Sequence, residues 1–172
     1  MRVAPLAVAA GLCGCQNMPP PYAPPVQRQA FEDYHPRVVR VVDMSDPDAR
    51  FRFAQDFFDQ PGPWRWTGKR PTIRVPVRSA DNLHLVMDYA IADATFKTTG
   101  PVKIVIYVND KVAAARTHSE PGQQHFDFPL PPGTVEANKD AVIAVEIDKV
   151  WVSPTDATEL GFILSRIGLT QE

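Results

Sequence analysis

Cysteine is nearly absent from this chain: Cys13 and Cys15 are the only two among 172 residues, and both lie near the N-terminus. Without further thiols for an internal disulfide, a folded domain must be held together by its apolar core. The chain also has no excess of basic charge, because it contains 18 lysines and arginines but 20 acidic residues. The basic residues are scattered along the sequence. The sequence therefore predicts no nucleic-acid partner.

The short motifs of common enzymes are absent as well. There is no G-x-S-x-G, no H-E-x-x-H, no glycine-rich phosphate loop and no paired C-x-x-C, so we expect a protein that is not an enzyme. Two groups of side chains have metal-ligand chemistry: His118, Glu120 and His125 around a turn, and Asp43, Asp46 and Asp48 further upstream. Loop, turn and cap roles explain both groups more simply, so we expect no cofactor and find no support for a structural calcium ion.

No hydrophobic run is long enough to span a bilayer, which needs about 20 residues as a helix. The charged start Met1-Arg2 and the apolar residues 3–12 instead have the pattern of an export signal. Leu12-Cys13-Gly14-Cys15 resembles the lipobox of bacterial lipoproteins, which implies cleavage before Cys15 and a diacylglycerol on its thiol. Cys13 is the less suitable competitor, because the larger Leu12 precedes it directly, and an ordinary apolar N-terminus is the alternative to a signal.

The residues after Cys15 predict an envelope location and a tether. Gln16 rather than Asp follows the cysteine, which favours the outer over the inner membrane, and buried acyl chains contribute about 0.8 kcal/mol per methylene group to anchoring. Five prolines between residues 19 and 25 favour an extended spacer of roughly 3.1 Å per residue. The expected organisation is a signal peptide at 1–14, the lipidated cysteine and proline-rich tether at 15–35, and one domain at 36–172.

Alternating apolar and polar residues dominate that domain, a pattern typical of half-buried strands. The expected strands lie within residues 73–77, 83–91, 102–108, 111–116, 126–128, 143–147 and 162–169, with shorter candidates at 38–42 and 64–67. Asn109-Asp110 predicts a tight hairpin turn. Ser45 to Asp48 could start a short helix, although residues 51–53 fit a strand equally well, and residues 153–159 could form a single turn. This organisation predicts an all-β, antiparallel β-sandwich of the jelly-roll kind.

Three short segments carry a resemblance to a known class of domain. Residues 62–68 (Gly-Pro-Trp-Arg-Trp-Thr-Gly), the hairpin at 108–111, and residues 159–162 together with Ile167 resemble a β-sandwich module that bacteria append to glycosyltransferases and other glycan-handling proteins. The resemblance covers about residues 49–170. It implies the β-sandwich fold and an association with glycans.

Aromatic residues offer the best candidates for a binding site. If the chain is extended around Arg65, the indoles of Trp64 and Trp66 point to one face, and the guanidinium can hydrogen-bond sugar hydroxyls beside them. The alternative is that both indoles belong to the core and pack over Phe57 or Phe58. Tyr107 lies opposite the core face of its strand, and we expect it to be exposed.

Two functions from different classes remain open. A lipid-anchored module that binds envelope glycan predicts an exposed aromatic row beside polar groups. An assembly lipoprotein that docks on another envelope protein predicts a contiguous apolar patch or a long unpaired strand edge.

Overall fold

The computed structural model describes residues 40–60 and 62–171. The predicted signal peptide, the lipidated Cys15 and the proline-rich tether lie outside the described residues. In the part of the chain that is described, no helix is both long enough and apolar enough to cross a membrane.

Eleven strands, one α-helix and one 3-10 helix make up the described fold. The strands are β1 (Val41–Asp43), β2 (Phe53–Phe57), β3 (Arg65–Val77), β4 (Leu83–Ile91), β5 (Val102–Val108), β6 (Lys111–His118), β7 (Gly122–Pro129), β8 (Lys139–Ile147), β9 (Trp151–Val152), β10 (Glu159–Leu160) and β11 (Ile163–Gln171). The helices are η1 (Pro47–Arg52), of the 3-10 type, and α1 (Asp93–Thr99).

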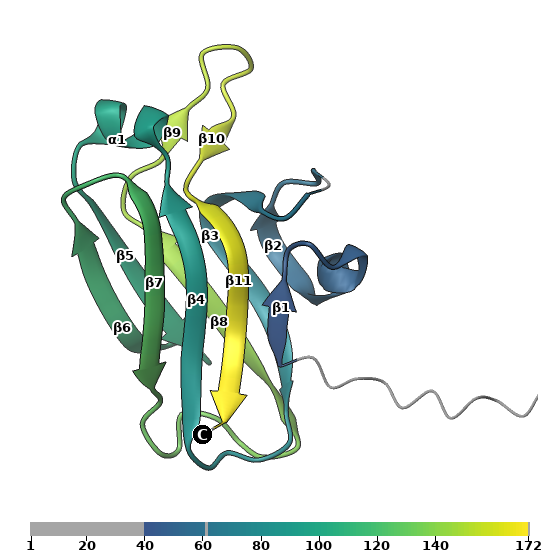
Figure 1. Cartoon of the computed structure of the whole chain (residues 1–172). Helices are drawn as coiled ribbons and strands as arrows, with labels where there is room; N and C mark the ends of the chain where they lie inside the picture. The colour runs from purple at the N-terminus through teal and green to yellow at the C-terminus, as the bar shows by residue number, and fades with distance from the viewer. Residues whose placement is uncertain (1–39, 61, 172) are drawn as a thin grey trace, which may run out of the picture. The chain divides into compact units, whose positions relative to one another are not determined.

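Nine of the strands form an antiparallel sheet that curls into two layers (Figure 1), and β9 and β10 form a separate two-stranded sheet. The hydrogen-bonded order is β6-β5-β8-β3-β11-β4-β7, with β1 added to β11 and β2 added to β3. We call β1, β11, β4 and β7 the front layer, and β2, β3, β8, β5 and β6 the back layer. β3 joins them, because Arg65 and Trp66 pair with Leu164 and Ile163 of β11 whereas residues 72–77 pair with β8. This architecture confirms the predicted all-β sandwich.

The core lies between the two layers and is built by alternation along each strand. Ile73 and Val75 of β3, Leu85 of β4, Ile104 of β5 and Ile143 of β8 are each at most 1% exposed. Every second residue of a strand points to the same face, so the alternating runs in the sequence identify the inner faces correctly. The bounds of β4 and β5 coincide with the expected runs at 83–91 and 102–108.

The turn between β5 and β6 confirms the predicted hairpin. Asn109 and Asp110 have φ values of 50° and 62°, as a two-residue type I′ turn requires. The Asn109 side chain also ties this turn to the neighbouring chain: its amide donates to the Thr134 carbonyl at 3.0 Å, and its oxygen accepts the Val142 N–H at 3.0 Å.

The short helical elements only partly match expectation. η1 begins after Asp46, whose carboxylate accepts the Asp48 N–H at 2.8 Å, which confirms the short helix. The alternative strand at residues 51–53 is wrong for Phe51 and Arg52, which end η1, and β2 begins only at Phe53. The expected single turn lies between β9 and β10, where the Ala157 N–H donates to the Ser153 carbonyl. α1 was not predicted. Its N-cap Ala92 makes no side-chain capping bond, so the sequence lacks a start signal there.

A close backbone approach holds the start of β3 against the segment that leads into β11. A Cβ atom on Gly161 would lie 2.4 Å from the Gly68 carbonyl oxygen, so this position requires glycine. The Gly161 N–H donates to the Thr67 carbonyl at 2.7 Å, and the Thr67 N–H donates to the Phe162 carbonyl at 3.0 Å. Residues almost a hundred positions apart are thereby brought into direct contact.

We expect Gly161→Ala to lower the free energy of unfolding by about 1–3 kcal/mol, because the added methyl group meets rigid backbone. Gly68→Ala is the matched comparison. Its Cβ would lie 3.2 Å from the Asp56 Cβ and Cγ atoms, so a much smaller shift would relieve the contact than at Gly161. Chemical denaturation measures both variants, and a Gly161→Ala loss no larger than that of Gly68→Ala would contradict the proposed contact.

Candidate functional site

Trp64, Arg65 and Trp66 do not point to one surface. Trp64 precedes β3 and is 40% exposed, and Trp66 is half-buried within β3. Arg65 is only 6% exposed and faces the opposite side of the strand from Trp66. Neither indole is fully buried, so the interpretation of both as core residues is wrong. Whether these three residues bind a ligand stays a prediction.

Tyr107 lies on the outer face of the back layer, where alternation predicts it, but it is half-buried there and not exposed as expected. The Arg70 guanidinium covers its ring, with Cζ 4.7 Å from the ring centroid. Two carboxylates flank the guanidinium, Asp110 and Glu146, each with an oxygen 3.7 Å from a guanidinium nitrogen. Both contacts are ion pairs, and at 3.7 Å they are longer than hydrogen bonds.

Asp56 lies next to Arg70 because β2 is irregular. The β2–β3 register shifts on both sides of Gln55, and Asp56 has a φ of 59°, a conformation that residues other than glycine rarely adopt. Its carboxylate accepts the Arg70 N–H at 2.8 Å and its side chain lies over Gly68. Strained residues of this kind concentrate at functional sites.

A depression of about 440 Å³ opens beside this contact. Its lining residues are Asp56, Phe57, Phe58, Gly68, Lys69 and Glu159. The Trp66 backbone adjoins it, because the Phe58 N–H donates to the Trp66 carbonyl at 3.2 Å. Gly68 is on the face that Trp66 and Arg70 share, and because it has no side chain, the Asp56 side chain can lie over it.

We call this surface the β3 groove: Trp66, Gly68 and Arg70 of β3 with Asp56, Lys69, Glu159, Tyr107, Asp110 and Glu146 around them. From Trp66 to Arg70 the strand extends over about 13 Å, at about 3.3 Å per residue. Four carboxylates face two cations in the groove, so its local charge is negative. Sequence reasoning missed Asp56 and Arg70. An isolated glycine inside a strand pattern, here Gly68, was the available signal of a close approach.

Three of the histidines are bound to other side chains. The His118 imidazole is buried and hydrogen-bonded to the Tyr89 hydroxyl at 2.8 Å, and this burial lowers the pKa of His118. His125 bonds Asp88 at 2.5 Å and His84 bonds Asp127 at 2.9 Å, both on the front layer. Across residues 40–60 and 62–171, no three histidine, cysteine or acidic side chains are grouped so as to hold a metal ion.

Asp88 also forms part of a ladder of charges across the front layer. Burial opposes its ionisation, but the hydrogen bond from His125 and the positive charge of Arg166 outweigh this effect and lower the pKa of Asp88. Asp43, Arg166, Asp88 and His125 occupy directly opposed positions on β1, β11, β4 and β7. The charges of this ladder are paired by hydrogen bonds, whereas Arg70 of the β3 groove meets Asp110 and Glu146 only at 3.7 Å.

No protein-family model matches this sequence, and no curated protein matches it. Solved structures that resemble the fold include an acetyl xylan esterase from Butyrivibrio proteoclasticus, at 11% identity and a TM-score of 0.45, with 77% of this chain covered. The chain spans about a third of the length of that esterase, 32%.

Carbohydrate-binding modules are also among these structures. The CBM36-1 domain of a multidomain xylanase from the hindgut metagenome of Trinervitermes trinervoides is 7% identical with a TM-score of 0.40, covering 74% of this chain and 94% of that domain. A family 35 module from Clostridium thermocellum is 11% identical with a TM-score of 0.38, covering 70% and 87%. Similarity at these values gives this chain neither a family nor a ligand.

The inward side chain of Arg65 has buried polar atoms that lack hydrogen-bond partners. Its Nε and Nη1 atoms are buried and have no hydrogen-bond partner among the described residues. Leaving buried donors of a charged group unpaired costs free energy that a well-packed apolar side chain would not.

We therefore expect Arg65→Met to raise the free energy of unfolding by about 1–3 kcal/mol, because it removes unpaired buried charge while keeping most of the side-chain volume. Arg74→Met is the matched control, since Arg74 is exposed on the same strand and should change stability by less than about 0.5 kcal/mol. Chemical denaturation tests both. Lower stability of Arg65→Met would show that its guanidinium has a partner in solution.

Proposed function

We propose that this protein is a non-catalytic glycan-binding module of the β-sandwich type, anchored in the cell envelope. One observation carries the proposal: the β3 groove places a half-exposed indole and a guanidinium along one strand, with several carboxylates around them, beside a depression of about 440 Å³. This volume lies within the range of ligand sites, about 300–1,000 Å³.

The groove matches the two sides of a sugar ring. A pyranose has an apolar C–H face, which can lie against the Trp66 indole, and a rim of hydroxyls, which need both donors and acceptors. Arg70 supplies donors, and Asp56 and Glu159 supply acceptors. Because Arg70 covers the Tyr107 ring, the guanidinium plane rather than the phenol ring is the flat surface at this end.

Native gel electrophoresis through matrices that contain xylan, dextran or chitosan tests this function. We expect at least one polysaccharide to retard the protein, and Trp66→Ala to weaken that retardation about tenfold through the loss of an aromatic contact. Arg70→Ala should weaken it as well. Phe51→Ala is the control, because Phe51 is 71% exposed on η1 but does not line the groove.

Equal retardation of wild type and Trp66→Ala would contradict the proposal that polysaccharide binds in the β3 groove. No retardation by any polysaccharide, together with an envelope protein that co-purifies, would favour docking on a protein partner. One feature supports that second function: β6 ends the sheet, no described strand pairs with its outer edge, and its Val112 is 64% exposed. This edge is poorly suited to pairing with another chain, because it carries Lys111, Arg116 and a register shift. Glycan binding is therefore the better supported function.

The proposed anchor is a diacylglycerol on Cys15, with the outer membrane as its location. We expect metabolic labelling with palmitate to mark the protein, and Cys15→Ser to abolish the label and release the protein from the membrane fraction. Cys13→Ser is the matched control and should keep both. A labelled Cys15→Ser variant, or an unlabelled Cys13→Ser variant, would overturn the assignment.

A further inference from the structure

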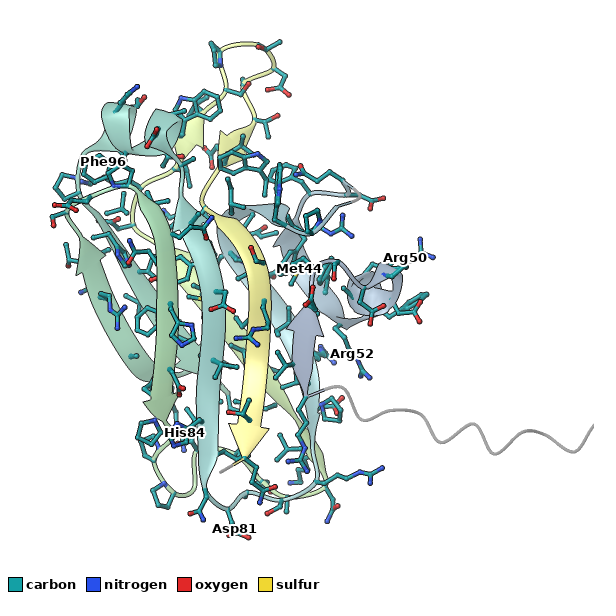
Figure 2. All side chains as sticks on the ribbon, in the orientation of Figure 1. Met44, Arg50, Arg52, Asp81, His84 and Phe96 are labelled. Atoms are coloured by element: carbon teal, nitrogen blue, oxygen red, sulfur yellow. The ribbon has the colours of Figure 1, made fainter. Side chains whose placement is uncertain are left out.

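A second hollow lies at the end of the sandwich formed by the β3–β4 turn, remote from α1 (Figure 2). We call it the end pocket. It has a volume of about 400 Å³ and is lined by Ala80, Asp81, Asn82, Leu83, His84, Pro129, Leu130 and Pro132. None of these residues belongs to the β3 groove, so any ligand here occupies a separate site.

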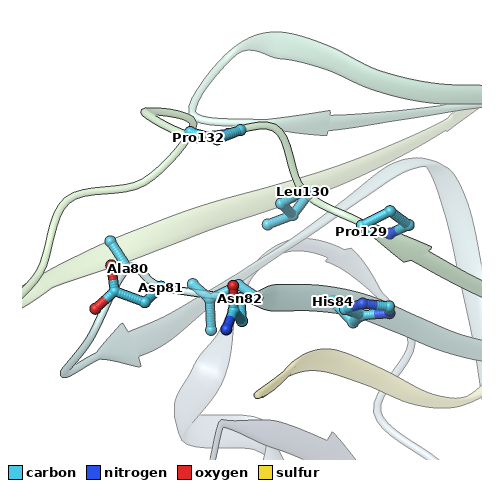
Figure 3. Close-up of a pocket in the computed structure, with 8 residues that line it drawn as sticks. Ala80, Asp81, Asn82, His84, Pro129, Leu130 and Pro132 are labelled. Carbon is cyan, nitrogen blue, oxygen red and sulfur yellow. The ribbon is translucent and has the colours of Figure 1, made fainter. Parts of the chain in front are cut away.

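Polar groups form one side of the end pocket. Asp81, Asn82 and His84 follow one another along the β3–β4 turn and the start of β4 (Figure 3). Asn82 has a φ of 47°, and its side-chain amide makes no hydrogen bond to any other residue that the structure describes. The amide therefore offers both a donor and an acceptor to a ligand.

The His84 ring is held in place rather than free to rotate. Its Nδ1 lies 2.9 Å from an Asp127 oxygen on β7, and its side chain is 21% exposed. This bond fixes the plane of the imidazole at one end of the pocket. A fixed polar group favours binding, because less side-chain freedom is lost when a ligand arrives.

Apolar groups form the facing side. Pro129, Leu130 and Pro132 stand opposite the polar row (Figure 3), and the Leu130 N–H donates to the Leu83 carbonyl at 2.8 Å. The proline nitrogens carry no hydrogen. The pocket thus has a polar row and an apolar wall, which match the hydroxyl rim and the C–H face of a sugar ring.

The charge of the pocket narrows the class of ligand. The Asp81 carboxylate accepts a hydrogen bond from the Ser79 hydroxyl at 3.0 Å but forms no ion pair with any described cation. A ligand carboxylate would therefore meet an uncompensated negative charge. An uncharged sugar ring or an amino sugar would not be repelled.

We propose that the end pocket binds a sugar ring that carries no acid group, as a second glycan subsite separate from the β3 groove. This inference rests on the proposed glycan-binding function. Two sites on one domain would allow it to hold a glycan at two points or to bridge two chains, and either arrangement raises the apparent affinity without new contacts.

Titration of the ¹⁵N-labelled full chain with glucosamine, glucose and glucuronate, followed by NMR, tests the end pocket directly. We expect glucosamine and glucose, but not glucuronate, to shift the side-chain amide signal of Asn82, which the Asn82→Gly variant identifies by its loss. Glycine keeps the left-handed backbone at this position, so that variant should fold. The affinity of Asn82→Gly for glucosamine, followed by the backbone amide signals of the other residues that line the pocket, should fall about two- to tenfold, the effect of one lost hydrogen bond.

Asn138→Gly is the matched control, because Asn138 also has a positive φ, 60°, but does not line the pocket. An unmoved Asn82 signal, or equal affinity of Asn82→Gly and Asn138→Gly for glucosamine, would overturn the proposal that the end pocket binds a sugar. The β3 groove is tested independently, since loss of polysaccharide retardation in Trp66→Ala with no response at Asn82 leaves the proposed function standing and removes only the second subsite. A shift of Asn82 by glucuronate as well would overturn the charge argument.

Discussion

β3 belongs to the back layer, but its first residues pair with β11 of the front layer, and four hydrogen bonds between Thr67 and the Gly161–Phe162 backbone hold this crossing in place. The backbone bonds join Thr67 to both residues, and the Thr67 hydroxyl donates to the Phe162 carbonyl at 2.9 Å and accepts the Phe162 N–H at 3.2 Å. Thr67 is fully buried, so these bonds are shielded from water and costly to lose. Without this crossing, the front and back layers would share no strand.

The crossing also determines what the surface presents. Gly68 leaves the outer face open one residue later, and the bulged β2 brings the Asp56 carboxylate over it. Glu159 arrives from the opposite direction on β10, next to Gly161. The β3 groove is therefore a consequence of the same backbone contact that stabilises the fold. An uncommon backbone conformation at Asp56 persists because β3 holds its carboxylate through the Arg70 N–H.

The alternation of residues was sufficient to locate most strands, because side-chain direction along a strand is a local property with a period of two. Tyr107 is on the outer face for this reason. The same rule separates Arg65 from Trp66, although their proximity in sequence had suggested a shared platform. α1 was missed because its N-terminus carries no capping side chain, and tertiary packing rather than local preference supports so short a helix.

The sequence by itself determined that the chain forms an all-β domain, which faces of its strands are buried, and where the hairpin at Asn109-Asp110 turns. Only the tertiary structure decided that Asp56 meets Arg70, and that the row from Asp81 to His84 faces Pro129 and Pro132. These encounters depend on which strands become neighbours and in what register. Strand pairing joins residues far apart in the chain, and a single sequence carries no local signal of such partners.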